Sequence, residues 1–320
     1  MAAVTRALVT GGSGFVGRYL VDALRGEGSQ VLVCGGPHDR SNFLPLDLDD
    51  LASIRAALDI AKPDVIFHLA AQTFVPQSFE APAETYETNA LGSARVAQAV
   101  REYVRDGEAM PRIVFTSSAE VYGPRDDDEF PLRETLQLHP ATPYAASKAA
   151  AEAILLSEAR TFGLDVVVAR AFNHIGPGQS ERFVVPALAR QLAGIAAGGA
   201  PLLLVGNLNA SRDFLDVRDV VAAYLALARD GEAGEAYNVC SGSAVKVRDV
   251  LRELIVIAGV AVVVREDPQR MRPLDVPRFV GSAEKLQSRT GWRPSIPLQR
   301  SLRDVYASAR EATGNSGTAP

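Results

Sequence analysis

The sequence has few cysteines and lacks any long apolar run. Only two of its 320 residues are cysteine, Cys34 and Cys240, and both stand beside strand-like apolar segments. This count argues against a disulfide framework and predicts reduced, buried thiols in a cytoplasmic protein. No apolar run approaches about 18 residues, and the first residues enter a strand pattern without a charged leader, so we expect neither a membrane span nor a membrane partner.

The sequence also lacks an excess of positive charge. It has 33 Lys and Arg residues against 38 Asp and Glu residues, a formal net charge of -5, and its basic residues are scattered. Nucleic acid is therefore not expected as a partner. Because no His/Cys cluster has the spacing of metal ligands, no metal is expected either. With 47% hydrophobic residues, the chain is long enough for one large domain or two moderate ones.

The hydrophobic pattern alternates between short strand-like runs and helical segments. The predicted strands are residues 7–10, 31–34, 65–69, 113–117 and 166–169, and the predicted helices are residues 14–25, 51–58, 82–105 and 143–161. Short apolar, β-branched runs are typical of a buried parallel sheet, and helices between them are typical of crossover connections. The pattern predicts an α/β fold with a Rossmann-like, doubly wound parallel sheet.

After Arg170 the pattern becomes irregular, which predicts a smaller α/β C-terminal substrate lobe. A strand-like run at 235–240 would return to the main sheet. We therefore expect a dinucleotide-binding domain at 1–170 plus about 213–242, a substrate lobe at about 171–212 and 243–313, and a disordered tail at 314–320.

A glycine-rich turn follows the first predicted strand and opens the first helix. Gly11, Gly14 and Gly17 have the spacing for a tight turn, close phosphate approach and helix-on-sheet packing. Amide groups at the helix N-terminus would face the pyrophosphate of a dinucleotide. The other residues expected along this cofactor are Phe15, Val16, Leu48, Leu69, Ala70, Ala71 and Asn89.

The segment after the second predicted strand bears on which dinucleotide is bound. The acid that would bind the ribose 2'-hydroxyl of NAD is missing there, whereas His38 and Arg40 could meet the 2'-phosphate of NADP. Asp39 opposes that charge, and a solvated loop is the alternative. NADP(H) is favoured and NAD(H) is possible. Asp47 either accepts a hydrogen bond from the adenine amino group or caps the following helix.

Tyr144 and Lys148 have the i, i+4 spacing that places two side chains on one face of a helix. A nearby ammonium favours phenolate over phenol, so Lys148 is predicted to lower the pKa of Tyr144 toward working pH. Tyr144 would then exchange a proton, and Lys148 could also hold a ribose hydroxyl. The alternative is a chance pair on an exposed helix.

These features together resemble the extended short-chain dehydrogenase/reductase family over nearly the whole chain. The resemblance rests on the glycine turn, the 68–72 segment, Asn89, Ser118 and the Tyr144/Lys148 pair. It implies that Ser118 holds a substrate hydroxyl or carbonyl, that Tyr144 exchanges the proton, and that Lys148 binds the nicotinamide ribose. It also implies that the cofactor supplies the hydride.

Segments at 170–179, 211–219, 237–242 and 271–277 are similar to those of GDP-4-dehydro-6-deoxy-D-mannose reductases, which make GDP-D-rhamnose. The resemblance implies a sugar-nucleotide substrate whose diphosphate is held by Arg212 and Arg272, because forked cationic donors suit phosphate. It also implies a diphosphate or sugar contact from Asn173 and a ribose contact from Asp275. Without the resemblance, the two arginines would be interpreted as residues on a solvated face. Asn173 would be a turn residue before Gly and Pro, and Asp275 would cap a turn.

Glu120 leaves the reaction open, because related sugar-nucleotide 4,6-dehydratases use a glutamate at this position to remove the C5 proton. A GDP-mannose dehydratase or a 4-epimerase is therefore the alternative to the favoured reductase, and a non-catalytic dinucleotide sensor is a remote one.

His68 and His174 are interpreted as packed residues without chemical roles. The Ala-rich helices at 82–105 and 143–161 predict a homodimer, unless their alanines pack only on the sheet.

Overall fold

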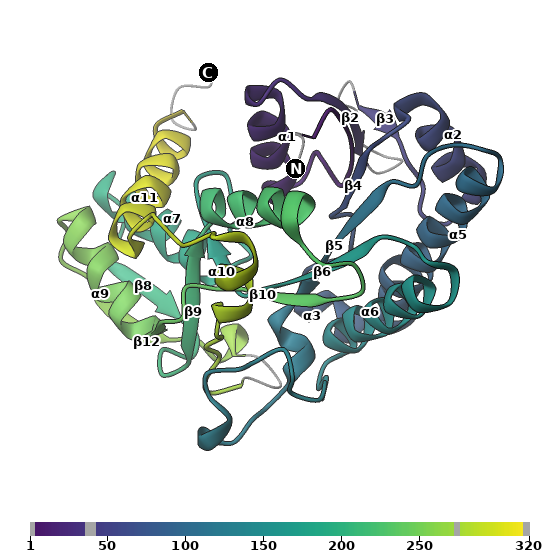
Figure 1. Ribbon diagram of the computed structural model, residues 1–320. Helices are drawn as coiled ribbons and strands as arrows, with labels where there is room; N and C mark the ends of the chain where they lie inside the picture. Colours follow the sequence, from purple (N-terminus) through teal and green to yellow (C-terminus); the bar gives the residue numbers. More distant parts are fainter. Residues whose placement is uncertain (1–3, 36–42, 272–275, 316–320) are drawn as a thin grey trace. The chain divides into compact units, whose positions relative to one another are not determined.

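The computed structural model describes residues 4–35, 43–271 and 276–315. The chain divides into two compact units, each built from three stretches of sequence (Figure 1). The first unit contains Met1–Ala171, Val221–Val239 and Ser282–Arg293. The second contains Phe172–Val220, Cys240–Gly281 and Pro294–Pro320.

The first unit is built on a seven-stranded parallel sheet in the order β10-β6-β5-β4-β1-β2-β3. The strands are β1 (Arg6–Thr10), β2 (Gln30–Gly35), β3 (Leu44–Pro45), β4 (Val65–His68), β5 (Arg112–Ser118), β6 (Val166–Ala171) and β10 (Ala236–Val239). The strand order reverses between β1 and β4. Ligands of doubly wound sheets bind outside the carboxyl ends of the strands at such a reversal. The predicted Rossmann-like sheet is confirmed.

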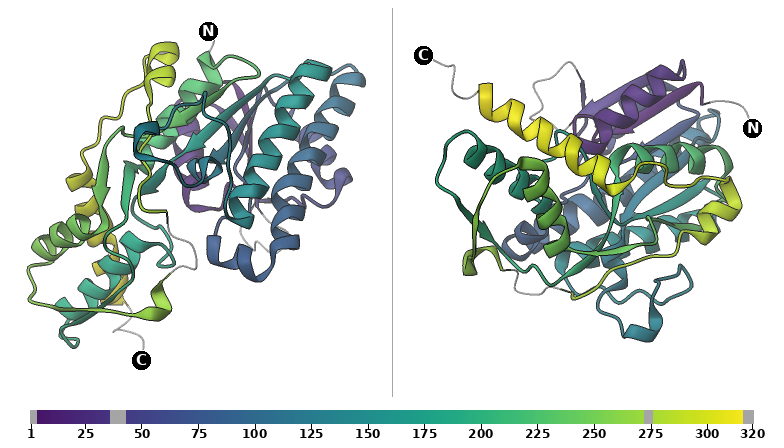
Figure 2. Two further views of the ribbon diagram at one scale, coloured as in Figure 1. Left: turned by 90° about the horizontal axis from the view of Figure 1, so that it is seen from below. Right: turned by 90° about the vertical axis from the view of Figure 1, so that its left-hand side faces the viewer.

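Helices cover this sheet. They are α1 (Phe15–Gly26), α2 (Leu51–Ala61), α3 (Val75–Glu80), α4 (Pro82–Tyr86), α5 (Gly92–Arg105), α6 (Pro143–Phe162), α8 (Val217–Asp230, from Val221 in this unit) and α10 (Glu284–Thr290). Helices α2, α5 and α6 lie side by side on one face (Figure 2). Leu8, Ile66 and Phe115 point from neighbouring strands into that layer and form its buried core. Alternation along each strand turns the intervening side chains to the other face.

One predicted helix is interrupted. The pattern predicts a single helix over 82–105, but α4 is followed by a π-helix, Glu87–Leu91, before α5 begins. The hydrophobic period cannot reveal a one-turn π segment, because the helix axis continues through it. Single π turns inside α-helices frequently occur at functional sites, and this one carries Asn89.

The second unit has its own small sheets and helices. Strands β7 (Asn173–Ile175), β9 (Ser211–Asp216) and β11 (Ala244–Lys246) form one sheet, and β8 (Leu202–Val205) pairs with β12 (Val263–Glu266) in another. The helices are α7 (Val184–Ala196), α9 (Val247–Ala258) and α11 (Leu298–Asn315). These three helices pack on one another around buried Leu188, Leu192 and Leu254.

The unit boundaries differ from those predicted. The sequence placed 213–242 in the dinucleotide domain, but β9 pairs with β7 and β11 in the second unit, and the returning segment is Val221–Val239. A further return, Ser282–Arg293, was not predicted; in it Lys285 donates to the Ala236 carbonyl at 2.8 Å and so ties α10 to β10. An apolar run does not reveal which strand it pairs with. Helix α11 continues to Asn315, so residues 314 and 315 are not part of a disordered tail, and the rest of the predicted tail lies outside the described residues.

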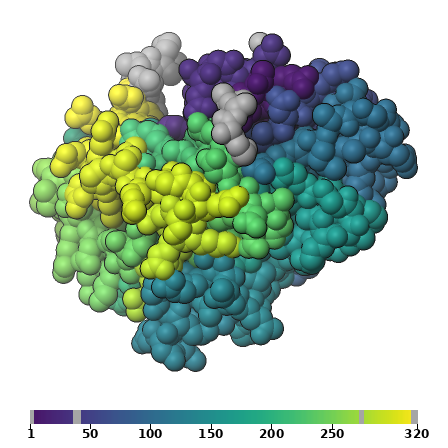
Figure 3. Space-filling model, viewed as in Figure 1, coloured from purple at the N-terminus to yellow at the C-terminus, as the bar shows by residue number. Residues whose placement is uncertain are grey.

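Three further features bear on the predicted class of protein. After β5, residues 123–142 make a largely exposed excursion that contains a short 3-10 helix, Asp127–Glu129 (Figure 3). Cys34 and Cys240 are both buried and neither is in a disulfide, as predicted. Within the described ranges, no helix is long and apolar enough to cross a membrane, and no three His, Cys, Asp or Glu side chains could hold a metal ion.

Candidate active site

The glycine turn has the backbone geometry that only glycine tolerates. Gly11 has φ +69°, and a Cβ there would lie 2.8 Å from the Ala70 backbone nitrogen and 3.0 Å from the Leu69 carbonyl carbon. The turn after β1 therefore touches the turn after β4. A Cβ on Gly17 would lie 2.4 Å from the Gly11 carbonyl oxygen, which explains why α1 can pack directly on the turn. Gly11, Gly17, Leu69 and Ala70 are thus brought together.

The N-terminus of α1 suits an anionic group. Its N-cap is Gly14, which offers no side-chain hydrogen bond, and the first turn from Phe15 through Val16 contains no acidic residue. The backbone amides of the first helical turn have no intrahelical acceptor, and they lie at the positive end of the helix dipole. Both features favour a phosphate there. The turn and the helix end together fit the pyrophosphate of NADP(H). When bound, the reduced nicotinamide of this cofactor supplies a hydride.

The predicted adenosine contacts are only partly described. His38 and Arg40 lie outside the described residues. The Asp47 carboxylate accepts a hydrogen bond from the Asp49 amide at 2.9 Å, whereas Asp50 caps α2 by accepting from the Ala52 amide at 2.9 Å. The alternative interpretation of Asp47 as the helix cap is therefore wrong, and its contact with adenine stays a prediction.

Leu48 and Asn89 shape the same end of the sheet. Leu48 is buried, and its side chain packs against Gly92. A Cβ added at Gly92 would lie only 3.0 Å from the Leu48 Cβ. The Asn89 amide accepts from the Gln72 amide at 2.8 Å and donates to the Gln72 carbonyl and the Ser147 hydroxyl, both at 2.9 Å. Asn89 thereby fixes the 69–72 segment, which includes Ala71, against α6. Direct contacts of these residues with the cofactor stay predictions.

Ser118, Tyr144 and Lys148 meet at the carboxyl end of β5. Ser118 is the last residue of β5 and caps the 3-10 helix Ala119–Tyr122 by accepting from the Glu120 amide at 3.2 Å. Helix α6 begins beside it, because Thr142 caps the helix by accepting from the Ala145 amide at 3.0 Å. Tyr144 is hydrogen-bonded to Ser118, and both Tyr144 and Lys148 are buried. The predicted common face of Tyr144 and Lys148 is confirmed.

The pKa of Tyr144 differs from the prediction. Burial raises it above its ordinary value, the charge of Glu120 raises it further, and the hydrogen bond from Ser118 lowers it only in part. The expectation that Lys148 brings this pKa down is wrong for this structure, because desolvation dominates in the buried site. Tyr144 is therefore a neutral phenol at neutral pH, which is the protonation state of a proton donor.

Lys148 faces the sheet. Its ammonium donates to the Thr116 carbonyl at 2.9 Å and lies 5.0 Å from the centre of the Phe115 ring. Burial lowers the pKa of Lys148 to about 8, against the raising effect of the Glu152 charge. The side chain is therefore mostly cationic at pH 7, and it loses its proton as pH rises through about 8.

The two histidines interpreted as packed residues differ in burial, because His68 is buried and His174 is half-buried. His68 is fully buried, and its two ring nitrogens bond to the hydroxyls of Thr10 at 2.8 Å and Ser93 at 3.1 Å. Burial, with the charge of Lys148, lowers its pKa to about 3, so it is neutral. His174 bonds to the Phe172 carbonyl at 3.0 Å.

The predicted substrate residues lie in the second unit. Asn173 begins β7, and Arg212 is on β9, the strand that pairs with β7. Arg212 donates to the Ser211 carbonyl at 2.9 Å, and its guanidinium lies 5.7 Å from the centre of the Phe279 ring. Asn173 is exposed and Arg212 is partly buried. Arg272 and Asp275 lie outside the described residues. The roles of all four in substrate binding stay predictions.

A buried ion pair that the sequence did not predict lies behind the site. Glu152 lies four residues after Lys148 on α6, and its carboxylate pairs with Arg170 at 2.7 Å. The spacing of residues 144, 148 and 152 was a visible signal, because three residues four apart share a helix face.

The parallel sheet, the glycine turn at the strand reversal and the Ser118/Tyr144/Lys148 group define an extended short-chain dehydrogenase/reductase. Within that class, the chain belongs to the family described as GDP-mannose 4,6 dehydratase, whose family model matches residues 8–305.

The similar proteins include sugar-nucleotide reductases and epimerases. The GDP-6-deoxy-D-mannose reductase of Pseudomonas aeruginosa is 42% identical over 303 residues, which cover 94% of this chain and 96% of that protein. The solved structure of RMD from Pseudomonas aeruginosa, complexed with NADPH, is 39% identical with a TM-score of 0.86 and covers 96% of this chain and 100% of that one. The Thermus thermophilus UDP-glucose 4-epimerase, in complex with NAD, is 32% identical with a TM-score of 0.85, covering 96% and 100%.

Proposed function

We propose that this protein reduces the C4 ketone of GDP-4-dehydro-6-deoxy-D-mannose to give GDP-D-rhamnose, with NADPH favoured as the hydride donor and NADH possible. The observation that carries the proposal is the Ser118–Tyr144 pair, in which Tyr144 holds its proton because its pKa is raised. The 42% identity with the protein named GDP-6-deoxy-D-mannose reductase supports the substrate class. The NADPH complex of a similar structure supports the cofactor.

The site residues divide the work of ketone reduction. Ser118 and Tyr144 both offer hydroxyl hydrogens to the ketone oxygen, where negative charge develops as the hydride arrives at carbon. Tyr144 then transfers its proton to that oxygen. The product alcohol has therefore gained one hydrogen at carbon, which arrived as hydride, and one at oxygen, which arrived as a proton. Lys148 stays cationic near neutral pH and is proposed to hold the nicotinamide ribose. Arg212 and Arg272 are proposed to bind the diphosphate, and Asn173 and Asp275 to bind neighbouring sugar groups.

The proposal is tested by mixing the protein with the 4-keto sugar nucleotide and NADPH or NADH, and separately with GDP-mannose and NADP. We expect loss of NADPH absorbance and a product heavier than the ketone by two hydrogen atoms. Water loss from GDP-mannose without net cofactor change would instead identify a dehydratase.

Glu120 favours the dehydratase as a second candidate, because its charge acts on Tyr144. Glu120→Gln is therefore an informative change. For a reductase we expect the rate of ketone reduction to stay within about tenfold of the unaltered protein, since no step requires a base at this position. For a dehydratase the same change would lower water loss from GDP-mannose by about 10²-fold or more, because the C5 proton would lose its acceptor. Parallel progress curves on both substrates distinguish the two.

We also propose that the protein is a homodimer that works in the cytoplasm. Ala97, Ala99 and Ala151 are buried in the first unit, so these alanines cannot form the predicted contact. Large apolar side chains on the same segment are nevertheless exposed, with Tyr86 at 40% and Leu91 at 46%. A second copy of the chain is the proposed partner for them.

Light scattering at micromolar concentration is expected to give twice the chain mass for the unaltered protein, and the single chain mass for Leu91→Arg with unchanged circular dichroism. A single-chain mass for the unaltered protein would remove the dimer proposal.

A further inference from the structure

The end of β5 is connected to α6 at three consecutive residues. The Thr116 carbonyl accepts from the Lys148 ammonium, and Ser118 bonds to Tyr144. Between them, the Ser117 hydroxyl donates to the Glu152 carboxylate. The three α6 residues are spaced four apart and share one face, so Glu152 continues the face that carries the two predicted catalytic side chains.

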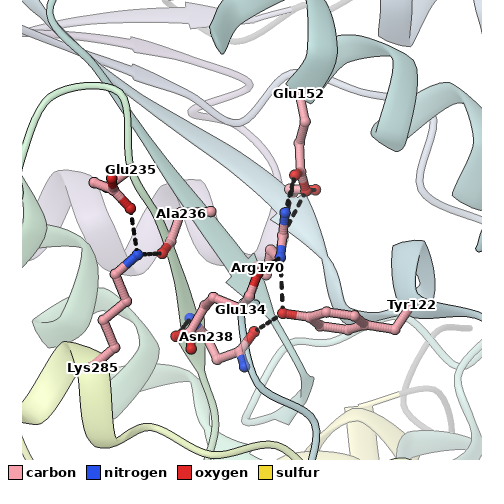
Figure 4. Close-up of polar contacts among 9 residues, drawn as sticks. Tyr122, Glu134, Glu152, Arg170, Glu235, Ala236, Asn238 and Lys285 are labelled. Carbon is pink, nitrogen blue, oxygen red and sulfur yellow. Dashed lines mark hydrogen bonds and ion pairs between the residues drawn. The ribbon is translucent and has the colours of Figure 1, made fainter. Parts of the chain in front are cut away.

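Glu152 is held in a closed polar environment. Its side chain is 1% exposed, and Arg170 on β6 donates to it from Nε at 3.1 Å and 3.2 Å and from a terminal nitrogen at 2.7 Å. Figure 4 shows the Arg170 guanidinium between Glu152 and Tyr122, whose hydroxyl it bonds at 2.9 Å. Tyr122 in turn donates to the Asn238 side chain at 2.7 Å. Every partner lies in the first unit.

Stability alone is a weak reason for such a pair. Desolvation of two buried charges offsets much of their attraction, and apolar replacements of similar volume are often as stable. The position of Glu152, one helical turn beyond Lys148, gives the pair a second consequence. Its negative charge favours the cationic form of Lys148, whereas burial favours the neutral form.

The charged and titratable groups around Lys148 come from several elements. They are His68 on β4, Glu120 on the 3-10 helix after β5, Tyr144 and Glu152 on α6, Arg170 on β6, and Tyr224 on α8, which faces Tyr144. His68 and Tyr144 are neutral near pH 7, because burial lowers the pKa of the first and raises that of the second. Glu152 is the group that raises the pKa of Lys148.

We propose that Glu152, held by Arg170 and Ser117, is a positioning residue that keeps Lys148 cationic and aligned on the Thr116 carbonyl for its work on the cofactor. The inference rests on the proposed reductase function for its catalytic consequence. Its electrostatic part concerns Lys148 alone and can be measured without the sugar substrate.

The test follows NADPH binding by fluorescence, and the rate of ketone reduction, between pH 6 and pH 10 as a rough range around the Lys148 pKa. Affinity is expected to fall as pH rises through about 8 in the unaltered protein, since Lys148 then loses its charge. In Glu152→Gln this fall should move to lower pH by roughly one unit or more, the size expected on losing a nearby opposite charge.

Three further variants separate this role from a structural one. Glu152→Asp keeps the charge, and Ser117→Ala removes a hydrogen bond without removing charge, so in both the fall should stay close to its original pH. Glu152→Gln combined with Arg170→Met removes both buried charges and guards against misfolding of the single variant; its fall should move to lower pH by less than in Glu152→Gln, because the lost Arg170 charge acts on Lys148 in the opposite direction.

An unmoved pH dependence in folded Glu152→Gln, or a movement to higher pH in the double variant, would overturn the inference and leave the pair a structural one. If the unaltered protein binds NADPH with the expected pH dependence but reduces no ketone, the proposed function fails while the inference stands.

Discussion

Tyr144→Phe is expected to lower kcat for ketone reduction by about 10²- to 10⁴-fold, the usual contribution of a positioned proton donor. The change removes one oxygen, and with it both the transferable proton and a hydrogen bond to the developing alkoxide. Because Tyr144 is buried with a raised pKa, neighbouring water is a poor substitute. Stopped-flow measurement of NADPH oxidation at saturating substrate gives the rate of the affected step.

The matched control is Tyr103→Phe. Tyr103 is also buried, but on α5, where it packs under the Arg55 guanidinium at 5.5 Å. This variant should keep the unaltered kcat, and both variants should bind NADPH normally. A Tyr144→Phe enzyme within tenfold of the unaltered rate would show that another group supplies the proton.

Gly17→Ala is expected to weaken NADPH binding by about 10²-fold or more, and to lower kcat/KM with it. The new Cβ would lie 2.4 Å from the Gly11 carbonyl oxygen and 2.6 Å from the Gly12 Cα, both of them backbone atoms that cannot rotate away. Helix α1 must therefore move off the turn, and displacements of about 1 Å can cost two orders of magnitude. Titration of NADPH fluorescence measures the effect.

Gly26→Ala is the control on the same helix. Apart from its chain neighbours and the backbone of its own helix, no atom of the described residues lies within 4 Å of a Cβ at Gly26, and alanine has the higher helix propensity. We expect unchanged NADPH affinity and equal or slightly higher thermal stability. Equal affinities for the Gly17 and Gly26 variants would mean that the turn does not bind the pyrophosphate.

The features that the sequence predicted well are those with local signatures. The turn at Gly11 and Gly17 can be predicted from spacing, because each glycine is required by a close backbone contact. That contact is made within a few residues or at the end of the neighbouring strand. The Tyr144/Lys148 pair is likewise local, since one helical turn separates the two. The parallel sheet followed from short apolar runs alternating with helices.

The features that it missed depend on burial or on distant partners. The raised pKa of Tyr144 arises from desolvation, which spacing does not report, and so the predicted direction was wrong. Glu152 and Arg170 come from different elements and meet only after β6 pairs beside β5. The return of Ser282–Arg293 depends on its packing on β10 and leaves no period in the sequence.

The most direct test of the account is a turnover of GDP-4-dehydro-6-deoxy-D-mannose with NADPH in which both hydrogens at the nicotinamide C4 position are deuterium. The account predicts one deuterium at the C4 carbon of the sugar, and a product heavier than the ketone by one hydrogen and one deuterium, because the cofactor gives up its hydride and Tyr144 supplies a proton. Mass spectrometry and proton NMR locate the label. NADPH that remains unconsumed, or a reduced product without deuterium at C4, would contradict the account.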